Sequence, residues 1–123
     1  MVFDQTRRDE QIRRYIDHLD RYINVQKAIL FGSHAYGIPH EWSDIDLVVI
    51  SPDFAGQFMM DRLYFLYRAA WEARTNWIEP LGYTQEELES ASSLSLLGEV
   101  QERGVVVYSK ESGGKRKELV ATE

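Results

Sequence analysis

Two aspartates at the head of an apolar run are the residues of this sequence best suited to chemistry. Asp44 and Asp46 precede Leu47-Val48-Val49-Ile50, a run that is typical of a buried strand. Alternate side chains of a strand share a face, so both carboxylates are expected on one side, about 7 Å apart along the chain. At that spacing they can converge on two divalent ions, which lie roughly 3.5–4 Å apart in two-metal sites. The alternative is an acidic strand end that faces water.

A glycine-serine pair lies ten residues before these aspartates. Gly32-Ser33 interrupts a buried strand that we predict over residues 25–31. Such a turn can present backbone N–H groups and a hydroxyl to phosphate oxygens, especially where a helical turn begins. Gly32 would allow close approach of the backbone, and Ser33 would donate its hydroxyl. An ordinary tight turn is the alternative reading of the pair alone, but together with the two aspartates it indicates a phosphate site beside a metal site.

Glu79 is the candidate for a third carboxylate. Residues 74–79 have the β-branched and aromatic content of a strand, and Pro80 is expected to end its pairing. If this strand lies beside the one that carries the aspartates, Glu79 completes a three-carboxylate cage. If it does not, Glu79 is a solvent-facing strand end.

The stretch from Phe31 to Ile50 resembles the minimal nucleotidyltransferases of the DNA polymerase beta-like superfamily, whose signature is Gly-Ser, ten residues, Asp-x-Asp. Residues 77–84 and 102–108 look like that family's third-carboxylate strand and closing strand. The resemblance covers nearly the whole chain. It implies an enzyme that moves AMP or another nucleoside monophosphate from ATP or another nucleoside triphosphate to a hydroxyl.

The same resemblance implies roles for individual residues. Asp44 and Asp46 would bridge two Mg²⁺ ions, and Glu79 would complete the catalytic metal site and help to deprotonate the attacking hydroxyl. Gly32 and Ser33 would hold the departing phosphates.

The Gly32–Gly37 loop departs from the family pattern. Relatives commonly carry a basic residue near the positions of His34 and Tyr36, where it helps to neutralise a triphosphate, whereas this loop has no permanent cation. His34 can supply a partial charge, because its unperturbed pKa is about 6.5, or it is a simple loop residue. Tyr36 either stacks on a base or packs on the sheet.

Minimal nucleotidyltransferases of this kind resemble the antitoxin subunits of two-gene modules whose other protein is a helical HEPN toxin. The resemblance implies transfer of AMP onto a tyrosine of that toxin, a ribonuclease. Two other classes stay open. One is a binding module that neutralises a partner by contact, with a vestigial acidic site. The other is an enzyme that modifies a small molecule such as an aminoglycoside, whose positive charge an acidic protein would attract.

Charge and composition restrict the partners and the compartment. Fourteen basic against twenty acidic residues give a net charge of −6, and no basic face disposed to grip a nucleic-acid backbone is evident, which disfavours work on long DNA. The chain has no cysteine, so disulfides and thiolate zinc sites are excluded. No apolar run approaches the roughly 20 residues that cross a bilayer, and the charged N-terminus lacks a signal-peptide core. We therefore expect a cytoplasmic protein without a membrane partner.

Helices alternating with short strands predict an α/β domain with a mixed sheet of about four strands, flanked by helices. A first helix, capped by Thr6-x-x-Asp9, is expected to bury a stripe made of Ile12, Tyr15, Ile16, Leu19, Tyr22 and Ile23. Its five arginines alternate with acids, which indicates a solvated, salt-bridged face: Arg7, Arg8, Arg13, Arg14 and Arg21.

The second half predicts a helix over residues 56–73, a capping box at Thr84-x-x-Glu87 and a helix that ends near Arg103. Gly104 suits a left-handed position after that helix, and residues 105–108 are the last strand. We expect one nucleotidyltransferase domain over residues 1–109 and a flexible tail over residues 110–123.

The segment Phe58–Trp71 carries apolar residues around most of its helical circumference. A domain this small has trouble covering every side of such a helix, so part of it is expected to meet a partner protein or a second copy. Met59, Met60 and Tyr64 are the candidates. Coverage by the long loop or the terminal helix is the alternative.

Overall fold

The computed structural model describes residues 5–37 and 44–110 and contains one four-stranded sheet, in the order β3-β2-β1-β4. The strands are β1 Lys27–Phe31, β2 Ile45–Ile50, β3 Ile78–Tyr83 and β4 Val105–Ser109. β1 is antiparallel to both β2 and β4, whereas β2 and β3 are parallel. The predicted α/β class with a mixed sheet of four strands is confirmed.

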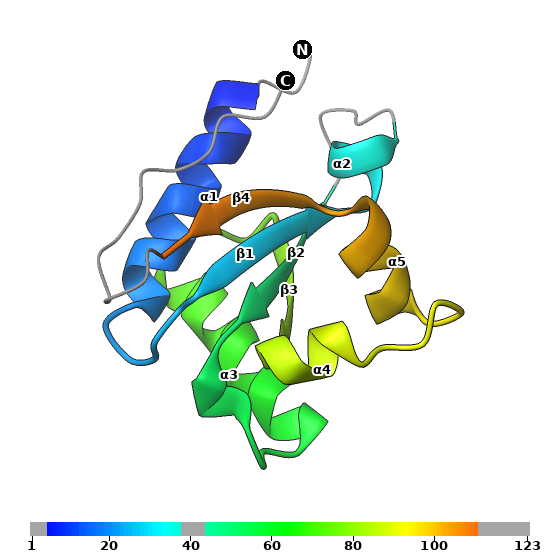
Figure 1. Ribbon diagram of the computed structural model, residues 1–123. Coiled ribbons are helices and arrows are strands. Elements are labelled where there is room, and N and C mark those ends of the chain that lie inside the picture. Colours follow the sequence, from blue (N-terminus) through cyan, green and yellow to red (C-terminus); the bar gives the residue numbers. More distant parts are fainter. Residues whose placement is uncertain (1–4, 38–43, 111–123) are drawn as a thin grey trace.

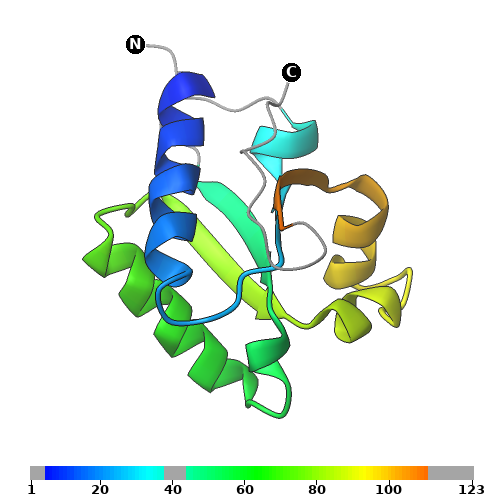
Figure 2. The same ribbon diagram turned by 60° about the vertical axis from the view of Figure 1, so that its left-hand side comes forward.

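Helices cover both faces of this sheet (Figures 1 and 2). α1 and α3 lie on one face, and α4 and α5 lie towards the other. The bounds are α1 Gln5–Leu19, α2 Ser33–Tyr36, η1 Pro52–Phe54, α3 Met59–Glu72, α4 Gln85–Glu89 and α5 Leu96–Arg103. In the part of the chain that the structure describes, no helix is both long and apolar enough to cross a bilayer.

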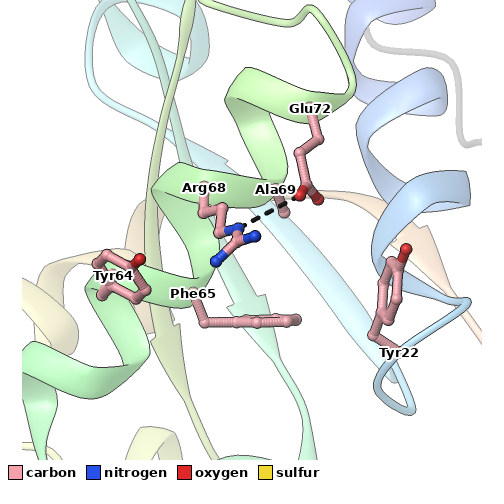
Figure 3. Close-up of a pocket in the computed structure, with 6 residues that line it drawn as sticks. All are labelled: Tyr22, Tyr64, Phe65, Arg68, Ala69 and Glu72. Carbon is pink, nitrogen blue, oxygen red and sulfur yellow. Dashed lines mark hydrogen bonds and ion pairs between the residues drawn. The ribbon is translucent and has the colours of Figure 1, made fainter.

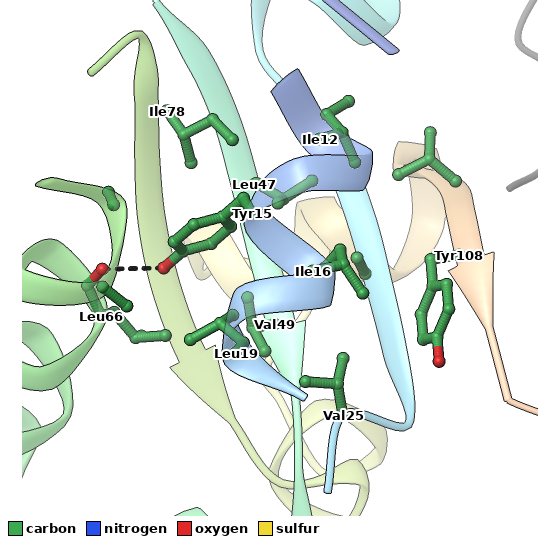
Figure 4. Close-up of a cluster of buried hydrophobic side chains, with 14 of the residues drawn as sticks. Ile12, Tyr15, Ile16, Leu19, Val25, Leu47, Val49, Leu66, Ile78 and Tyr108 are labelled. Atoms are coloured by element: carbon green, nitrogen blue, oxygen red, sulfur yellow. Dashed lines mark hydrogen bonds between the residues drawn. The ribbon is translucent and has the colours of Figure 1, made fainter. Parts of the chain in front are cut away.

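The larger core lies between the sheet and the α1/α3 layer (Figure 4). Tyr15 is fully buried there and donates a hydrogen bond of 2.8 Å to the carbonyl oxygen of Leu66, which joins α1 to α3. From β2 this core takes Leu47 and Val49, and from β3 it takes Ile78.

A smaller core fills the opposite face. It takes Val48 and Ile50 from β2, which alternate with the residues of the larger core, together with Leu88 of α4 and Val100 of α5. Continuing that alternation towards the start of β2 places the Asp46 side chain on the α4/α5 face.

The first helix differs from its prediction at both ends. Thr6 lies inside α1, so it is not the N-cap, and α1 stops at Leu19, before the last two residues of the expected stripe. Tyr22 follows in a turn and is 63% exposed, whereas the stripe residues within α1 are buried. Arg8 is also buried, which contradicts its placement on a solvated face.

Pro80 does not end strand pairing, contrary to prediction, because β3 continues through it to Tyr83. The order of the sheet explains why. Among the described residues, β3 has a neighbouring strand on one side only, and such an edge strand tolerates a residue without an N–H group.

Gly104 is not left-handed either. Its φ of −65° and ψ of 156° are extended, because β4 begins at the next residue. Glycine is required there for space, since a Cβ would collide with the carbonyl oxygen of Val100 and with Ile29.

Between β3 and β4 the chain forms two short helices rather than the single predicted one. α4 carries the predicted capping box, in which the Thr84 hydroxyl accepts from the Glu87 N–H and the Glu87 carboxylate accepts from the Thr84 N–H. A serine-rich turn follows, and Ser95 caps α5 by accepting from the Gly98 N–H. Lys110 is held by an ion pair with Asp20, and residues 111–123 of the expected tail lie outside the described residues.

Candidate active site

The turn after β1 is built around the backbone of Gly32. Its φ of +71° lies in the left-handed region, which glycine adopts without strain. Its carbonyl oxygen accepts from the N–H groups of Ala35 and Tyr36, at 3.0 and 3.1 Å, so a helical turn begins at Ser33. The predicted passage from a strand directly into a helical turn is therefore present, and binding of phosphate at this turn stays a prediction.

The same glycine lies directly against one of the predicted acids. A Cβ at Gly32 would collide with the Oδ2 atom of Asp46. The turn and the carboxylate therefore touch, although thirteen residues separate them in the chain. Any larger residue at position 32 would have to displace Asp46.

The three predicted acids lie near one another. Asp46 of β2 is in register with Glu79 of the neighbouring parallel strand β3, and Asp44 lies immediately before β2. The carboxylates of Asp44 and Asp46 both act on Glu79, which shows that the three side chains are close. The pKa of Glu79 is raised, first by burial and then by the charges of Asp44 and Asp46. Burial, followed by the charge of Asp44, also raises the pKa of Asp46.

These carboxylates repel one another, and a bound cation would relieve the repulsion. Carboxylate oxygens are the ligands that Mg²⁺ prefers, so the donor set fits that ion. Within residues 5–37 and 44–110, however, no group of three or more His, Asp or Glu side chains stands at metal-ligand spacing. The three acids lie close together, but their carboxylates are not at the spacing of ligands to a common metal ion.

A groove of about 410 Å³ opens beside two of these acids. The aromatic side chains of Tyr67 and Trp71 form part of its wall. Burial and the charges of Glu79, Asp46 and Asp44 raise the pKa of Tyr67, which places its hydroxyl within the field of all three. The lining residues are Asp44, Tyr67, Ala70, Trp71, Asn76, Ile78 and Glu79.

Arg8 is a cation at this site that sequence reasoning missed. Its guanidinium is buried, forms an ion pair of 3.1 Å with Asp9 and donates to the carbonyl oxygen of His34, at 3.4 Å, within α2. The loop itself has no permanent cation, but α1 brings one to it. The sequence of α1 gave no sign that Arg8 contacts α2. Arg8 lies among acidic residues, just as the exposed arginines of the same helix do.

Tyr36 packs on the sheet, which is one of the two alternatives predicted for this residue. It packs against the smaller core, and the guanidinium of Arg103 lies 4.2 Å from its ring centroid. His34 is buried within α2 rather than displayed on the loop surface.

Comparisons with known proteins agree with this geometry. The sequence profile of the nucleotidyltransferase domain matches residues 10–110. The structure is similar to that of a candidate nucleotidyltransferase from Sulfolobus solfataricus, with 20% identity, a TM-score of 0.66 and coverage of 89% of this chain and 87% of that one. It is also similar to a toxin–antitoxin structure with AMP-PNP, with 22% identity, a TM-score of 0.54 and coverage of 84% and 74%. At these identities the likeness shows the fold alone, and no curated protein matches the sequence significantly.

Proposed function

The chain belongs to the nucleotidyltransferase domain family, and we propose that it moves AMP from ATP to a hydroxyl group of a partner protein. The contact between Gly32 and Asp46 carries this proposal. It joins a turn that would bind the leaving phosphates to carboxylates suited to Mg²⁺, and transfer from ATP needs both.

Each residue of the site has a part in that transfer. The backbone N–H groups after Gly32 and the hydroxyl of Ser33 would bind the phosphates that leave. Asp44, Asp46 and Glu79 would hold Mg²⁺, whose chemistry when bound is to offset the negative charge of the phosphates. The acceptor oxygen forms a bond to the α-phosphorus as the bond to pyrophosphate breaks. Glu79 would help to take the proton of the acceptor hydroxyl.

A protein acceptor is supported by two observations. One structural neighbour is a toxin–antitoxin structure that contains AMP-PNP. In addition, the sequence signature resembles that of antitoxins paired with HEPN toxins. We therefore propose that the acceptor is a hydroxyl of a HEPN-type toxin, and that this chain acts as its antitoxin.

The test uses ATP labelled on the α-phosphate, Mg²⁺ and the protein encoded beside this one. Label is expected on that protein with the wild-type enzyme. Asp46→Asn should reduce the rate by about 100-fold, since it weakens metal binding. Glu102→Gln removes an exposed acid of α5 and is the matched control, which should keep the wild-type rate. Thermal melts confirm that both variants fold, and transfer by Asp46→Asn at the wild-type rate would contradict the role of Asp46.

A binding module remains a second candidate, because the acids do not stand at metal-ligand spacing in the described residues. In that case the chain would neutralise its partner by contact, and its acidic site would be vestigial. Neither Mg²⁺ nor ATP would then raise the melting temperature, and Asp46→Asn would neutralise the partner as well as the wild type does.

A further inference from the structure

Arg103, the last residue of α5, brings a further cation to the Gly32 turn. Its guanidinium lies 4.2 Å from the ring centroid of Tyr36, which belongs to α2. The N–H group of Tyr36 donates to the carbonyl oxygen of Gly32, at 3.1 Å, which ties this residue to the turn. The turn itself has no Lys or Arg between Gly32 and Gly37. Stacking on the ring of Tyr36 therefore supplies the turn with a positive charge from α5.

The pairing of β4 with β1 explains why Arg103 reaches the turn. Val105 pairs with Leu30 in the antiparallel ladder, and Gly104 before it is still extended. Continuing this pairing backwards by two residues brings Arg103 level with Gly32. In Figures 1 and 2, the C-terminal end of α5 accordingly lies beside the turn between β1 and α2.

The acids lie across β1 from Arg103. Asp46 of β2 is paired with Phe31 of β1 on one side and with Glu79 of β3 on the other. Neighbouring strands lie about 4.8 Å apart, so the backbone of Arg103 is two strand spacings, or about 10 Å, from that of Asp46 along this row. α5 packs on the same face of the sheet on which strand alternation places the Asp46 side chain. One end of the row is therefore acidic, and the other end carries a cation.

We propose that Arg103 binds the β- and γ-phosphates of ATP, and that the ring of Tyr36 holds the guanidinium in position for them. This inference rests on the proposed function, since it takes ATP as the substrate. With the α-phosphorus at the acids, the departing phosphates would lie across the Gly32 turn, towards Arg103. A guanidinium offers parallel N–H donors that match the oxygens of a phosphate, and its charge would offset that of the departing pyrophosphate.

The contacts of Arg103 leave its guanidinium able to meet a ligand. The side chain is 53% exposed, and its ion pair of 3.5 Å with Glu99 is an exposed i,i+4 pair, a kind that holds its partners weakly. Stacking on a ring occupies the face of a guanidinium and leaves its N–H edges open. Arg8 also reaches the turn, but it is buried and already donates to the carbonyl oxygen of His34.

Calorimetric titration with ATP and with AMP, each in the presence of Mg²⁺, tests the proposal. Arg103→Gln is expected to weaken ATP binding by about tenfold and AMP binding by less than about twofold, because AMP lacks the β- and γ-phosphates. Arg103→Lys keeps the charge without the planar fork, so it should recover part of the lost affinity for ATP.

Arg68→Gln is the matched control. Arg68 is likewise an exposed arginine in an i,i+4 ion pair with a glutamate, Glu72, at 3.3 Å. It lines a pocket on the opposite face of the sheet, between Tyr22 of the turn after α1 and Tyr64 of α3 (Figure 3). This variant should bind ATP as the wild type does, and thermal melts show whether the variants fold.

Tyr36→Leu tests the stacking, because it removes the ring and keeps the cation. It should weaken ATP binding by about threefold in the wild type and hardly at all in Arg103→Gln, since the two side chains act together. Additive losses would overturn the role of the ring.

The preference for ATP over AMP separates this inference from the proposed function. If the wild type prefers ATP and Arg103→Gln keeps that preference, the inference fails and the proposed function stands. If Arg103→Gln weakens both nucleotides alike, Arg103 only supports the fold, and the inference fails as well. A wild type that binds neither nucleotide would overturn the proposed function together with the inference.

Discussion

Gly32 is the residue on which the geometry of the site depends, because it needs both a positive φ and an open space beside Asp46. Gly32→Ala is expected to reduce the free energy of unfolding by about 2–3 kcal/mol, with contributions from backbone strain and from displacement of Asp46. Gly56 is a matched control with a φ of +77° and nothing within 4 Å of its missing Cβ. Gly56→Ala should reduce the free energy of unfolding by the backbone strain alone, about 1 kcal/mol. Urea unfolding measures both, and equal losses would show that the contact with Asp46 is unimportant.

Glu79 should make the stability of the protein depend on pH. Its pKa is raised in the fold, so its contribution to stability is fully present below its unfolded pKa and is lost as the pH rises through the folded one. Without metal, Glu79→Gln should therefore melt about 2–4 °C above the wild type at pH 7. That advantage should disappear in acid, where the wild-type carboxyl is protonated. Melting curves from pH 4 to 8 in a chelator measure the effect, and a lower melting temperature for the variant at pH 7 would contradict it.

Arg8 should contribute to the binding of a triphosphate, since its buried guanidinium lies beside the Gly32 turn, which we propose binds phosphate. Arg8→Met is expected to weaken ATP binding by about tenfold and AMP binding much less, because the loss follows the charge of the ligand. Arg13 lies on the exposed side of the same helix, so Arg13→Met is the control. Calorimetric titration separates the two nucleotides. Equal losses of affinity for ATP and AMP would indicate that Arg8 supports the fold rather than attracting the charge of the ligand.

Sequence reasoning at this scale found Asp44, Asp46 and Gly32 because local spacing fixes their relation to one strand and one turn. It could not find Arg8. That side chain meets His34 across 26 residues of sequence, and a contact of this kind depends on how α1 docks rather than on any pattern within α1.

At the scale of elements, the packing of α3 against α4 depends on one ion pair. Arg62 is 3% exposed, and both of its terminal nitrogens donate to Glu87, at 2.8 and 3.0 Å. Glu87 also closes the capping box of α4. Glu87→Ala should therefore reduce the free energy of unfolding by about 2–3 kcal/mol, because it leaves a buried guanidinium without its carboxylate. Glu86→Ala, at the exposed neighbouring position, should cost less than about 0.5 kcal/mol.

The pH dependence of this pair is opposite to that of Glu79. Arg62 is the main cause that lowers the pKa of Glu87, so the stabilisation is present at neutral pH and is lost as the pH falls through that lowered pKa. The difference between Glu87→Ala and the wild type should shrink in acid. Urea titrations at pH 7 and pH 3 measure it, and an unchanged difference would exclude the ion pair as its source.

The errors at the scale of elements have a common origin. Pro80 ends a strand only if the strand has neighbours on both sides, and Gly104 turns left-handed only if no strand begins at once. Both facts are properties of the assembled sheet. Apolar periodicity, in contrast, located β1, β2, α3 and β4 to within a few residues, because burial of one face is decided locally.

For the whole molecule, the order of helices and strands was enough to predict a mixed sheet with helices on it. The sequence singled out Met59, Met60 and Tyr64 as the uncovered residues of α3, and they are 39%, 74% and 68% exposed. It did not single out Tyr67 and Trp71, because α3 is apolar around most of its circumference and their exposure depends on how α1 and α4 pack. We propose that residues 1–109 act as one domain, since β4 pairs with β1 at one edge of the sheet.

The acidic groove is formed by the sheet and α3 together, because Tyr67 and Trp71 of α3 line it with Asp44 and Glu79. Mg²⁺ and ATP at 100 times the dissociation constant should stabilise the fold by about 2.7 kcal/mol. Tyr64 is exposed on α3 and does not line the groove, so Tyr64→Glu should show the same ligand-induced stabilisation as the wild type, measured by urea unfolding at equal protein concentration. If this variant loses the stabilisation, the exposed face of α3 and the proposed nucleotide site are coupled.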